Sequence, residues 1–344
     1  MFTRYHVAQR AVLWITTITL SACTTVSLAP LARKPLAQVR SWAIQLQGLE
    51  RSGAVASLQR ATVDLVVIEA TSNVRGSEGF ASADVVRKLR STPGEALPSK
   101  LVLAYLNVGQ AEDYRDYWRE DWRAPTTEER GSPDFLLSLD PEGWPGNYPC
   151  KVWDERWKRV LFGSPTAVLD RLLEAGFDGV YLDWVLGYED ASVRAVARAD
   201  DVDPARAMLE LVAELAAYAR ARKPGFLIVA QNAAWLGHEA PGFEAHIDAL
   251  AQEDLSFRGS ATAKWDDDDA GGIDTVRERL DEDGRDPLIE RLSEIRAGGL
   301  PILTLDYAVR REDVQRAIER SRSRAFVPTV SRTPLDRLPL LLPR

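Results

Sequence analysis

The sequence is poor in the residues that build metal sites and disulfide frameworks. Its 344 residues include two cysteines and three histidines, too few for a four-cysteine zinc site, a histidine-rich zinc site or a disulfide-stapled scaffold. The chain also has no G-x-S-x-G nucleophile elbow, no H-E-x-x-H zinc motif and no Walker phosphate loop. We therefore expect a functional site that holds no metal and no cofactor.

An excess of basic residues is lacking as well. The 43 basic and 51 acidic residues give a net charge of -8, and such a chain repels a phosphate backbone rather than attracting it. Nucleic acid is therefore not an expected partner. With 45% hydrophobic and 27% charged residues, the composition is that of a globular protein and excludes disordered and fibrous classes.

The first 22 residues have the order of an export signal. Arg4 and Arg10 come before an apolar run at 11–20, and small residues follow that run. Ten apolar residues are too few for a permanent membrane-spanning helix. The sequence Leu20-Ser21-Ala22-Cys23 resembles the lipobox of bacterial lipoproteins, in which the chain is cut before the cysteine and the thiol is acylated.

This resemblance predicts a signal peptide at 1–22, lipidation of Cys23 and a lipid anchor that holds the protein to a membrane of the cell envelope. A plain secretory signal is the alternative, and it would leave Cys23 free to pair with Cys150. Residues 23–40 contain two prolines and no periodic apolar pattern, so we expect a tether there and a folded domain at 41–340.

Eight short apolar runs alternate with helix-like stretches in that domain. The runs lie at 42–46, 64–70, 101–109, 178–184, 226–233, 247–254, 301–307 and 325–330. The helix-like stretches lie at 53–60, 82–91, 166–176, 204–222, 275–298 and 311–322. This order predicts a single-domain α/β fold, the (β/α)8 TIM barrel, whose active site lies at the carboxyl ends of the strands. A doubly wound open sheet is the competitor, but QLQGLERSG at 45–53 is a poor match to its glycine-rich phosphate loop.

The connection after the third predicted strand is unusually long and rich in aromatic residues. The segment 110–163 contains Tyr114, Tyr117, Trp118, Trp122, Trp144, Tyr148, Trp153 and Trp157. Long loops at the active-site face of a barrel tend to carry binding functions. We therefore expect this insertion to contribute to ligand binding.

Four of the apolar runs end on acidic residues. These are Glu69, Asp183, the pair Glu253 and Asp254, and Asp306. An acid after a strand often caps a helix or closes a turn. Asp183 and Glu253 are the strongest candidates for chemistry, because each directly follows an apolar strand. Their neighbours, Trp184 and Gln252, suit sugar binding.

Glycoside hydrolysis commonly uses two carboxyl groups that face each other across a cleft. One acts as proton donor and the other as nucleophile or base. Divalent-metal binding by oxygen ligands and simple charge repulsion relieved by arginines are the competing uses of such acids. Other polar residues near strand ends are candidate substrate-binding groups. They are Glu69, Tyr105, Asn107, Trp184, Asn232, Asp254, Asp306 and Tyr307.

The ordered motifs of the chain resemble one known family. SWAIQLQG, DLVVIEAT, LAYLNVGQAEDYRDYW, GFDGVYLDW, AQNA, AQED, ILTLDYA and FVPTVSRTPLDRL are similar to segments of the glycoside hydrolase family related to endo-α-1,4-polygalactosaminidase, glycoside hydrolase family 114. The resemblance runs from about Ser41 to Leu338.

The resemblance implies a (β/α)8 barrel that cleaves α-1,4-linked galactosamine polymers with an acid on the fourth strand and another on the sixth. By position these acids are Asp183, as nucleophile or base, and Glu253, as proton donor. The leading hypothesis is therefore an exported, membrane-anchored, endo-acting glycosidase of amino-sugar polysaccharide. A carbohydrate-binding lipoprotein without activity on the same barrel is the alternative, and a lyase or deacetylase is a third possibility.

Overall fold

The computed structural model describes residues 34–70, 80–91 and 100–338, which belong to one compact unit, Arg33–Arg344. The predicted signal peptide and Cys23 lie outside the described residues. None of the helices in the described ranges combines the length and the apolar character that a membrane-spanning segment requires.

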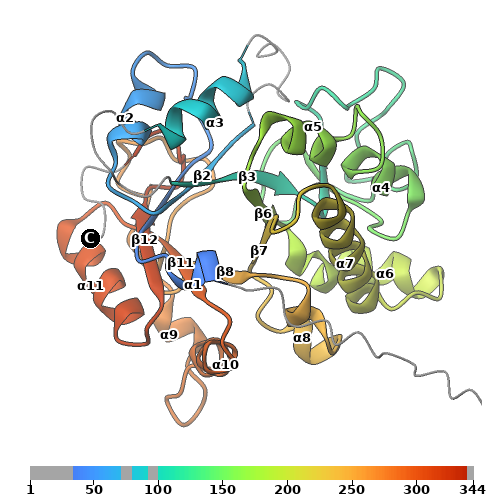
Figure 1. The fold of residues 1–344 in the computed structure, drawn as a ribbon. Helices are drawn as coiled ribbons and strands as arrows, with labels where there is room; N and C mark the ends of the chain where they lie inside the picture. Colours follow the sequence, from blue (N-terminus) through green and yellow to red (C-terminus); the bar gives the residue numbers. More distant parts are fainter. Residues whose placement is uncertain (1–33, 71–79, 92–99, 339–344) are drawn as a thin grey trace, which may run out of the picture. The chain divides into compact units, whose positions relative to one another are not determined.

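Eight parallel strands form the centre of the structure (Figure 1). They are β1 (Trp42–Gln45), β2 (Leu65–Ile68), β3 (Leu101–Asn107), β6 (Gly179–Asp183), β7 (Leu227–Gln231), β8 (Ala249–Glu253), β11 (Ile302–Tyr307) and β12 (Val327–Ser331). Their order in the sheet is their order in the chain. β12 lies beside β1, where the Trp42 indole N–H donates to the Val327 carbonyl at 2.9 Å. The strands therefore form a nearly closed (β/α)8 barrel, and all eight predicted strands are confirmed.

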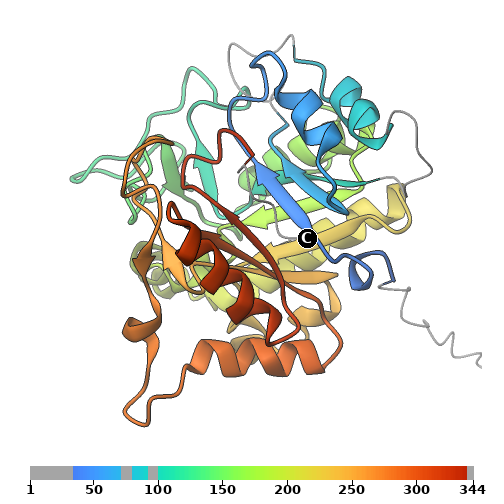
Figure 2. The ribbon, with the colours of Figure 1, turned by 90° about the vertical axis from the view of Figure 1, so that its left-hand side faces the viewer.

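Helices surround the strands (Figures 1 and 2). They are α2 (Ala54–Arg60), α3 (Ser82–Arg90), α4 (Glu155–Leu161), α5 (Val168–Ala175), α6 (Ala191–Ala199), α7 (Pro204–Arg222), α8 (Leu236–Glu239), α9 (Val276–Arg279), α10 (Pro287–Ala297) and α11 (Arg311–Arg322), with 3-10 turns at Val185–Glu189 and Phe243–Ala245. The helix expected over 275–298 is two helices, α9 and α10. The Asp286 side chain accepts the Ile289 N–H and Pro287 occupies the first turn of α10, which makes a new helix start there.

The start of the barrel differs from the predicted boundary at residue 41. Residues 34–40 were expected to be tether, but α1 (Lys34–Ala37) forms there. Leu36 and Val39 are buried in the same apolar cluster as Trp42 and Leu303. Two apolar contacts with the barrel interior therefore make this segment part of the folded domain.

Side chains alternate between the inside and the outside of the barrel, as the two-residue period of a strand requires. The interior cluster contains Trp42, Ile44, Leu65, Val67, Leu103, Tyr181, Leu227, Val229, Ala249, Ala251, Leu303 and Leu305. The residues between them, such as Val66, Val180 and Leu250, pack in the cluster shared with the helices. The next inward positions are then Glu69, Tyr105, Asp183, Gln231, Glu253 and Tyr307.

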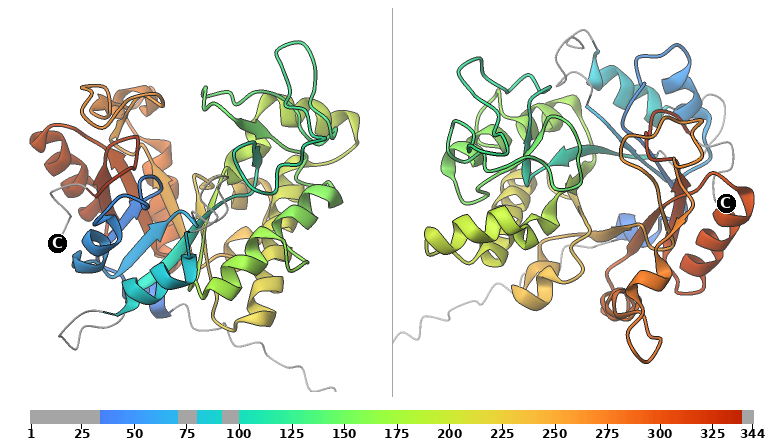
Figure 3. Two further views of the ribbon diagram at one scale, coloured as in Figure 1. Left: turned by 90° about the horizontal axis from the view of Figure 1, so that it is seen from above. Right: turned by 180° about the vertical axis from the view of Figure 1, so that it is seen from behind.

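The insertion after β3 and the segment after β8 extend from the same end of the barrel (Figures 2 and 3). In the insertion, β4 (Gln110–Glu112) pairs with β5 (Asn147–Pro149), and after β8 the short β9 (Phe257–Arg258) pairs with β10 (Ile273–Asp274), both antiparallel. Most aromatic residues of the insertion pack on one another: Tyr117, Trp118, Trp122, Phe135, Tyr148 and Trp157. These six rings form the insertion's own hydrophobic core, whereas Tyr114 and Trp144 of the same insertion line the cavity described below.

Candidate active site

A cavity of about 760 Å³ opens at the carboxyl ends of the strands. Its floor is the row of inward-facing strand-end side chains: Glu69, Tyr105, Asp183, Gln231, Glu253 and Tyr307. Trp184, Asn232 and Asp254 also line it, as do Gln110, Tyr114, Asp140, Glu142, Trp144 and Asn147 of the insertion. The structure thus brings eight of the ten predicted site residues to one cavity.

Asp183 is the last residue of β6 and is held by two donors. The Tyr105 hydroxyl donates to Oδ2 at 2.5 Å, and the Trp184 backbone N–H donates to Oδ1 at 2.7 Å. Burial raises the pKa of Asp183 to about 6, and these two hydrogen bonds oppose the rise. Asp183 is therefore mostly ionised at pH 7.

Glu253 is the last residue of β8 and is the more strongly shifted acid. The Tyr307 hydroxyl contacts Oε1, and the side-chain amides of Gln231 and Asn232 donate to Oε2. Burial, with added repulsion from Asp254 and Asp183, raises the pKa of Glu253 to about 8. Burial also raises the pKa of the neighbouring Asp254, to about 7. Glu253 therefore holds its proton more tightly than Asp183 does.

The residues that follow β6, β7 and β8 all have a left-handed backbone. Trp184 has φ 58°, Asn232 φ 55° and Asp254 φ 56°. Residues other than glycine adopt this conformation rarely, and it tends to occur where a site must be held in shape. The Asn232 side chain also accepts the Glu253 backbone N–H at 2.9 Å, so Asn232 couples the end of β7 to that of β8.

The Trp184 indole packs closely against glycine. A Cβ atom on Gly187 would lie 2.3 Å from Cε3 of Trp184, and a Cβ on Gly109 would lie 2.8 Å from the same atom. Trp184 is 9% exposed. It is therefore fixed in the wall of the cavity by residues that have no side chain.

Glu69 belongs to an ion-pair network that fastens the insertion to the barrel. Arg115 Nη1 lies 2.8 Å from Glu69 Oε1, and Arg115 Nε lies 2.7 Å from Glu112 Oε2. All three side chains are buried. Burial raises the pKa of Glu69, and Arg115 opposes that rise. Glu69 lines the cavity but already has a cation of the protein as its partner.

Asn107, a predicted substrate-binding residue, does not line the cavity. Its side-chain amide donates to Gln110 Oε1 at 3.0 Å and its Oδ1 accepts the Gln110 N–H at 2.9 Å. Gln110 Nε2 in turn donates to Asp140 Oδ2, and Asp140 Oδ1 accepts the backbone N–H of Trp144 at 2.9 Å. Asn107 thus begins a chain of hydrogen bonds that supports the Trp144 loop.

Asp306, also predicted to bind substrate, does not line the cavity either. In β11 the inward positions are Leu303, Leu305 and Tyr307, so Asp306 points to the opposite side. Its Oδ1 accepts the backbone N–H groups of Ser256 and Phe257, at 2.5 and 2.9 Å. Asp306 therefore ties the segment after β8 to β11.

Gln231 and the individual insertion residues that line the cavity were not among the predicted site residues. Gln231 is two residues beyond the buried Val229, so strict alternation along β7 was a signal that pointed to it. For Arg115, Asp140 and Trp144, nothing in the sequence separated cavity-lining residues from the many polar and aromatic residues around them.

Within the described ranges, no group of three or more His, Cys, Asp or Glu side chains is placed to hold a metal ion. Cys150 is buried and free, and burial raises the pKa of its thiol. Nothing in the described part of the site therefore resembles a metal centre or an activated thiol.

Comparison with known proteins agrees with this geometry. The model of glycoside-hydrolase family GH114 matches residues 23–341. The chain belongs to glycoside-hydrolase family GH114. The family resemblance seen in the sequence is thereby confirmed, and this member of GH114 is a glycoside hydrolase that acts on polysaccharide.

Relatives of this GH114 protein include an uncharacterized protein of Deinococcus radiodurans, 30% identical over 93% of this chain and 89% of that protein. Protein MJ1477 of Methanocaldococcus jannaschii, also uncharacterized, is 26% identical over 85% and 75% of the two chains.

Two solved structures share the fold. The glycoside hydrolase domain of PelA from Pseudomonas aeruginosa has a TM-score of 0.54 at 21% identity, covering 87% of this chain and 96% of that domain. Aspergillus fumigatus Ega3, in a complex with galactosamine, has a TM-score of 0.53 at 15% identity, covering 87% and 94% of the chains. At these identities the likeness supports the fold alone.

Removing the carboxyl group of Glu253 should stabilise the protein in alkaline solution. Because the pKa of Glu253 in the folded protein is raised above its ordinary value of 4.5, the folded protein binds the proton more tightly than the unfolded chain does. The free energy of unfolding therefore falls as pH rises from about 4.5 to 8. Glu253→Gln removes this dependence. We expect the free energy of unfolding of Glu253→Gln, measured by urea denaturation, to exceed that of the wild type by about 1–3 kcal/mol at pH 8. At pH 5 the difference should be much smaller.

The control is Glu120→Gln, which changes an exposed glutamate and should alter stability at neither pH. An equal effect of Glu253→Gln at both pH values would contradict a protonated Glu253 in the folded protein.

Proposed function

We propose that this GH114 protein is an endo-acting hydrolase of an amino-sugar polysaccharide, with α-1,4-linked galactosamine as the leading candidate. The observation that carries the proposal is the placement of two buried acids, Asp183 at the end of β6 and Glu253 at the end of β8, in one cavity. Burial raises the pKa of Glu253 further than that of Asp183. Such a pair supplies one proton donor and one ionised carboxylate at neutral pH.

The two acids have distinct roles in the proposed reaction. Glu253 donates its proton to the glycosidic oxygen while the bond from that oxygen to the anomeric carbon breaks. Asp183 either attacks the anomeric carbon or removes a proton from the attacking water, according to the separation of the two carboxyl groups. Tyr105 and the Trp184 N–H hold Asp183, which keeps its charge aimed into the cavity.

The charge of the cavity supports a cationic substrate. Among the described residues that line it, seven are acidic and one, Arg115, is basic. Arg115 is already paired with Glu69 and Glu112, so the remaining carboxyl groups give the cavity a negative potential. Protonated amino groups would be attracted into such a cleft. The complex of Ega3 with galactosamine is consistent with this choice of sugar.

The catalytic pair is tested by product analysis. On partially deacetylated galactosaminan we expect the wild type to release oligosaccharides, detected by mass spectrometry. Asp183→Asn and Glu253→Gln should each lower the rate by about 10³-fold or more, because each removes a group that takes part in the transition state. The rate of the wild type should be highest between about pH 6 and 8, where Asp183 is ionised and Glu253 protonated.

A matched control is Asp248→Asn. Asp248 lies at the opposite end of β8 from the cavity, where its Oδ2 accepts the Ile228 N–H at 2.8 Å, so its replacement should leave catalysis unchanged. Full activity of both cavity variants would exclude the proposed roles. Tight glycan binding without cleavage by the wild type would instead favour the carbohydrate-binding lipoprotein.

Trp144 offers a platform for a sugar ring. It lines the cavity, is half-buried, and its backbone is held by Asp140. We expect Trp144→Ala to raise KM for long galactosamine oligomers about fivefold with kcat nearly unchanged, because stacking on an aromatic ring contributes about 1 kcal/mol of binding. The control is Trp235→Ala, which removes a 39% exposed ring outside the cavity lining. Equal KM values for wild type and Trp144→Ala would contradict the platform.

We also propose that the enzyme acts from the cell envelope, anchored through a lipid on Cys23. The support is the sequence Leu20-Ser21-Ala22-Cys23 after an apolar run. Expressed in a bacterium, the full chain should be found in the membrane fraction with the added mass of acyl groups, whereas Cys23→Ser should not carry them. A wild-type chain without acyl mass would refute the anchor.

A further inference from the structure

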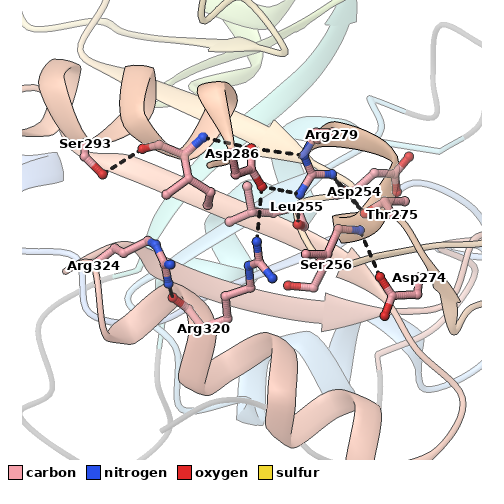
Figure 4. A network of polar contacts seen from close by, with 12 residues as sticks. Asp254, Leu255, Ser256, Asp274, Thr275, Arg279, Asp286, Ser293, Arg320 and Arg324 are labelled. Atoms are coloured by element: carbon pink, nitrogen blue, oxygen red, sulfur yellow. Dashed lines mark hydrogen bonds and ion pairs between the residues drawn. The ribbon is translucent and has the colours of Figure 1, made fainter. Parts of the chain in front are cut away.

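The segment directly after Glu253 is held by a polar network on the outside of the cavity wall (Figure 4). Arg279 Nη1 donates to the Asp254 carbonyl at 3.0 Å, and its Nη2 donates to the carbonyl of Leu255. The Thr275 hydroxyl donates to the same Asp254 carbonyl at 2.7 Å. Arg279 in α9 and Thr275 just before it therefore hydrogen-bond to the carbonyl groups of the two residues that follow the proposed proton donor.

Arg279 is itself oriented from outside. Its Nη2 lies 3.1 Å from Asp286 Oδ2, and Arg320 Nη2 lies 3.1 Å from the same oxygen. Asp286 also caps α10 through the Ile289 N–H. The side chain of Asp286 is 6% exposed and that of Arg279 21%. The guanidinium is thus fixed by two helices that pack on the barrel, and Figure 4 shows it between Asp286 and the Asp254–Leu255 backbone.

The backbone that Arg279 grips needs such support. Asp254 has φ 56°, a conformation that side chains disfavour and that persists where surrounding contacts impose it. On the opposite side, the Asp254 N–H donates to the Leu305 carbonyl at 2.9 Å, and the Ser256 N–H donates to Asp306. β11 thus holds the N–H groups of this turn, and Arg279 with Thr275 holds its carbonyls.

We propose that Arg279 is a positioning residue for Glu253: by holding the Asp254 and Leu255 carbonyls it fixes the turn that aims the Glu253 carboxyl group at Tyr307 and Gln231. This inference rests on the proposed function for its catalytic consequence. The guanidinium touches backbone and Asp286, so it acts through Glu253 and has no contact of its own with the reacting atoms.

The chain offers a matched control at the opposite end of the same strands. Arg220 in α7 donates to the His246 carbonyl at 3.1 Å and to Asp248 at 2.8 Å, and its side chain is 26% exposed. It therefore makes the same kinds of contact as Arg279, to a carbonyl and an aspartate, but before β8 rather than after it. Replacing Arg220 tests the stability that such an arginine provides without touching the cavity.

The first readout is kinetic. On partially deacetylated galactosaminan, Arg279→Ala should lower kcat about 10- to 100-fold with KM within twofold of the wild type, because small misplacement of a reacting group slows chemistry more than binding. Arg279→Lys, which keeps a donor for the carbonyls, should recover kcat to within about tenfold of the wild type. Arg220→Ala should lower the melting temperature and leave kcat unchanged. An unchanged kcat in Arg279→Ala, or an equal loss in Arg220→Ala, would overturn the proposal.

The second readout needs no substrate. Hydrogen exchange of the backbone amides of residues 254–257 should be faster in Arg279→Ala than in the wild type and in Arg220→Ala, with β7 unaffected. If the wild type cleaves no galactosamine polymer, the proposed substrate fails, and this exchange still decides whether Arg279 holds the turn. Equal exchange in all three proteins would overturn the proposal. If Arg279→Ala does not fold, Arg279→Met, which keeps an extended side chain without the donors, is used for both measurements, and wild-type values in both would overturn the proposal.

Discussion

The burial of two carboxyl groups at the inward ends of β6 and β8 is the constraint on which the rest of the site depends. Away from water, the charged form of each acid is disfavoured, and the surroundings decide how far. Asp183 receives a backbone N–H and the Tyr105 hydroxyl, which partly restore its charge. Glu253 has the charges of Asp254 and Asp183 nearby, which favour its protonated form. Two similar side chains in one cavity thus differ in how tightly they hold a proton.

The difference between the pKa values of Asp183 and Glu253 depends on the positions of the strand ends. Polar contacts around the rim of the barrel hold the strand ends in place. Asn232 bonds to the Glu253 N–H, Asp306 to the N–H groups of Ser256 and Phe257, and Arg279 to the carbonyls between them. Each contact uses a side chain from one strand or helix to fix the backbone of another. These bonds surround Asp254, the left-handed residue after β8, and hold the backbone on both sides of it.

The sequence predicted the strands well because buried parallel strands are short apolar runs, and eight of them appeared in order. The positions of two further residues could also have been predicted from the sequence. The two-residue alternation places Gln231 inside and Asp306 outside, from Val229 and Leu305 alone. The insertion is different, because whether an aromatic ring such as Trp157 or Trp144 is core or cavity wall depends on contacts between distant segments. The hydrogen bond that joins Gln110 to Asp140 links residues thirty apart in the sequence, and no local sequence pattern predicts it.

Some acids in and beside the cavity have partners within the protein and others keep a charge, and this difference supports a cationic substrate. Glu69 is paired with Arg115, Asp306 accepts two backbone N–H groups, and Glu253 keeps its proton. Asp183 retains its charge, and Asp254 has an oxygen without a hydrogen-bond partner among the described residues. Burial is the largest cause of the raised pKa of Glu253, and the charges of Asp254 and Asp183 add to it. A protonated amino sugar would offset the part due to these charges, because it would bring a positive charge among them. Binding would thus make Glu253 a stronger acid at the moment when the glycosidic oxygen needs its proton, which a neutral sugar of the same shape could not do.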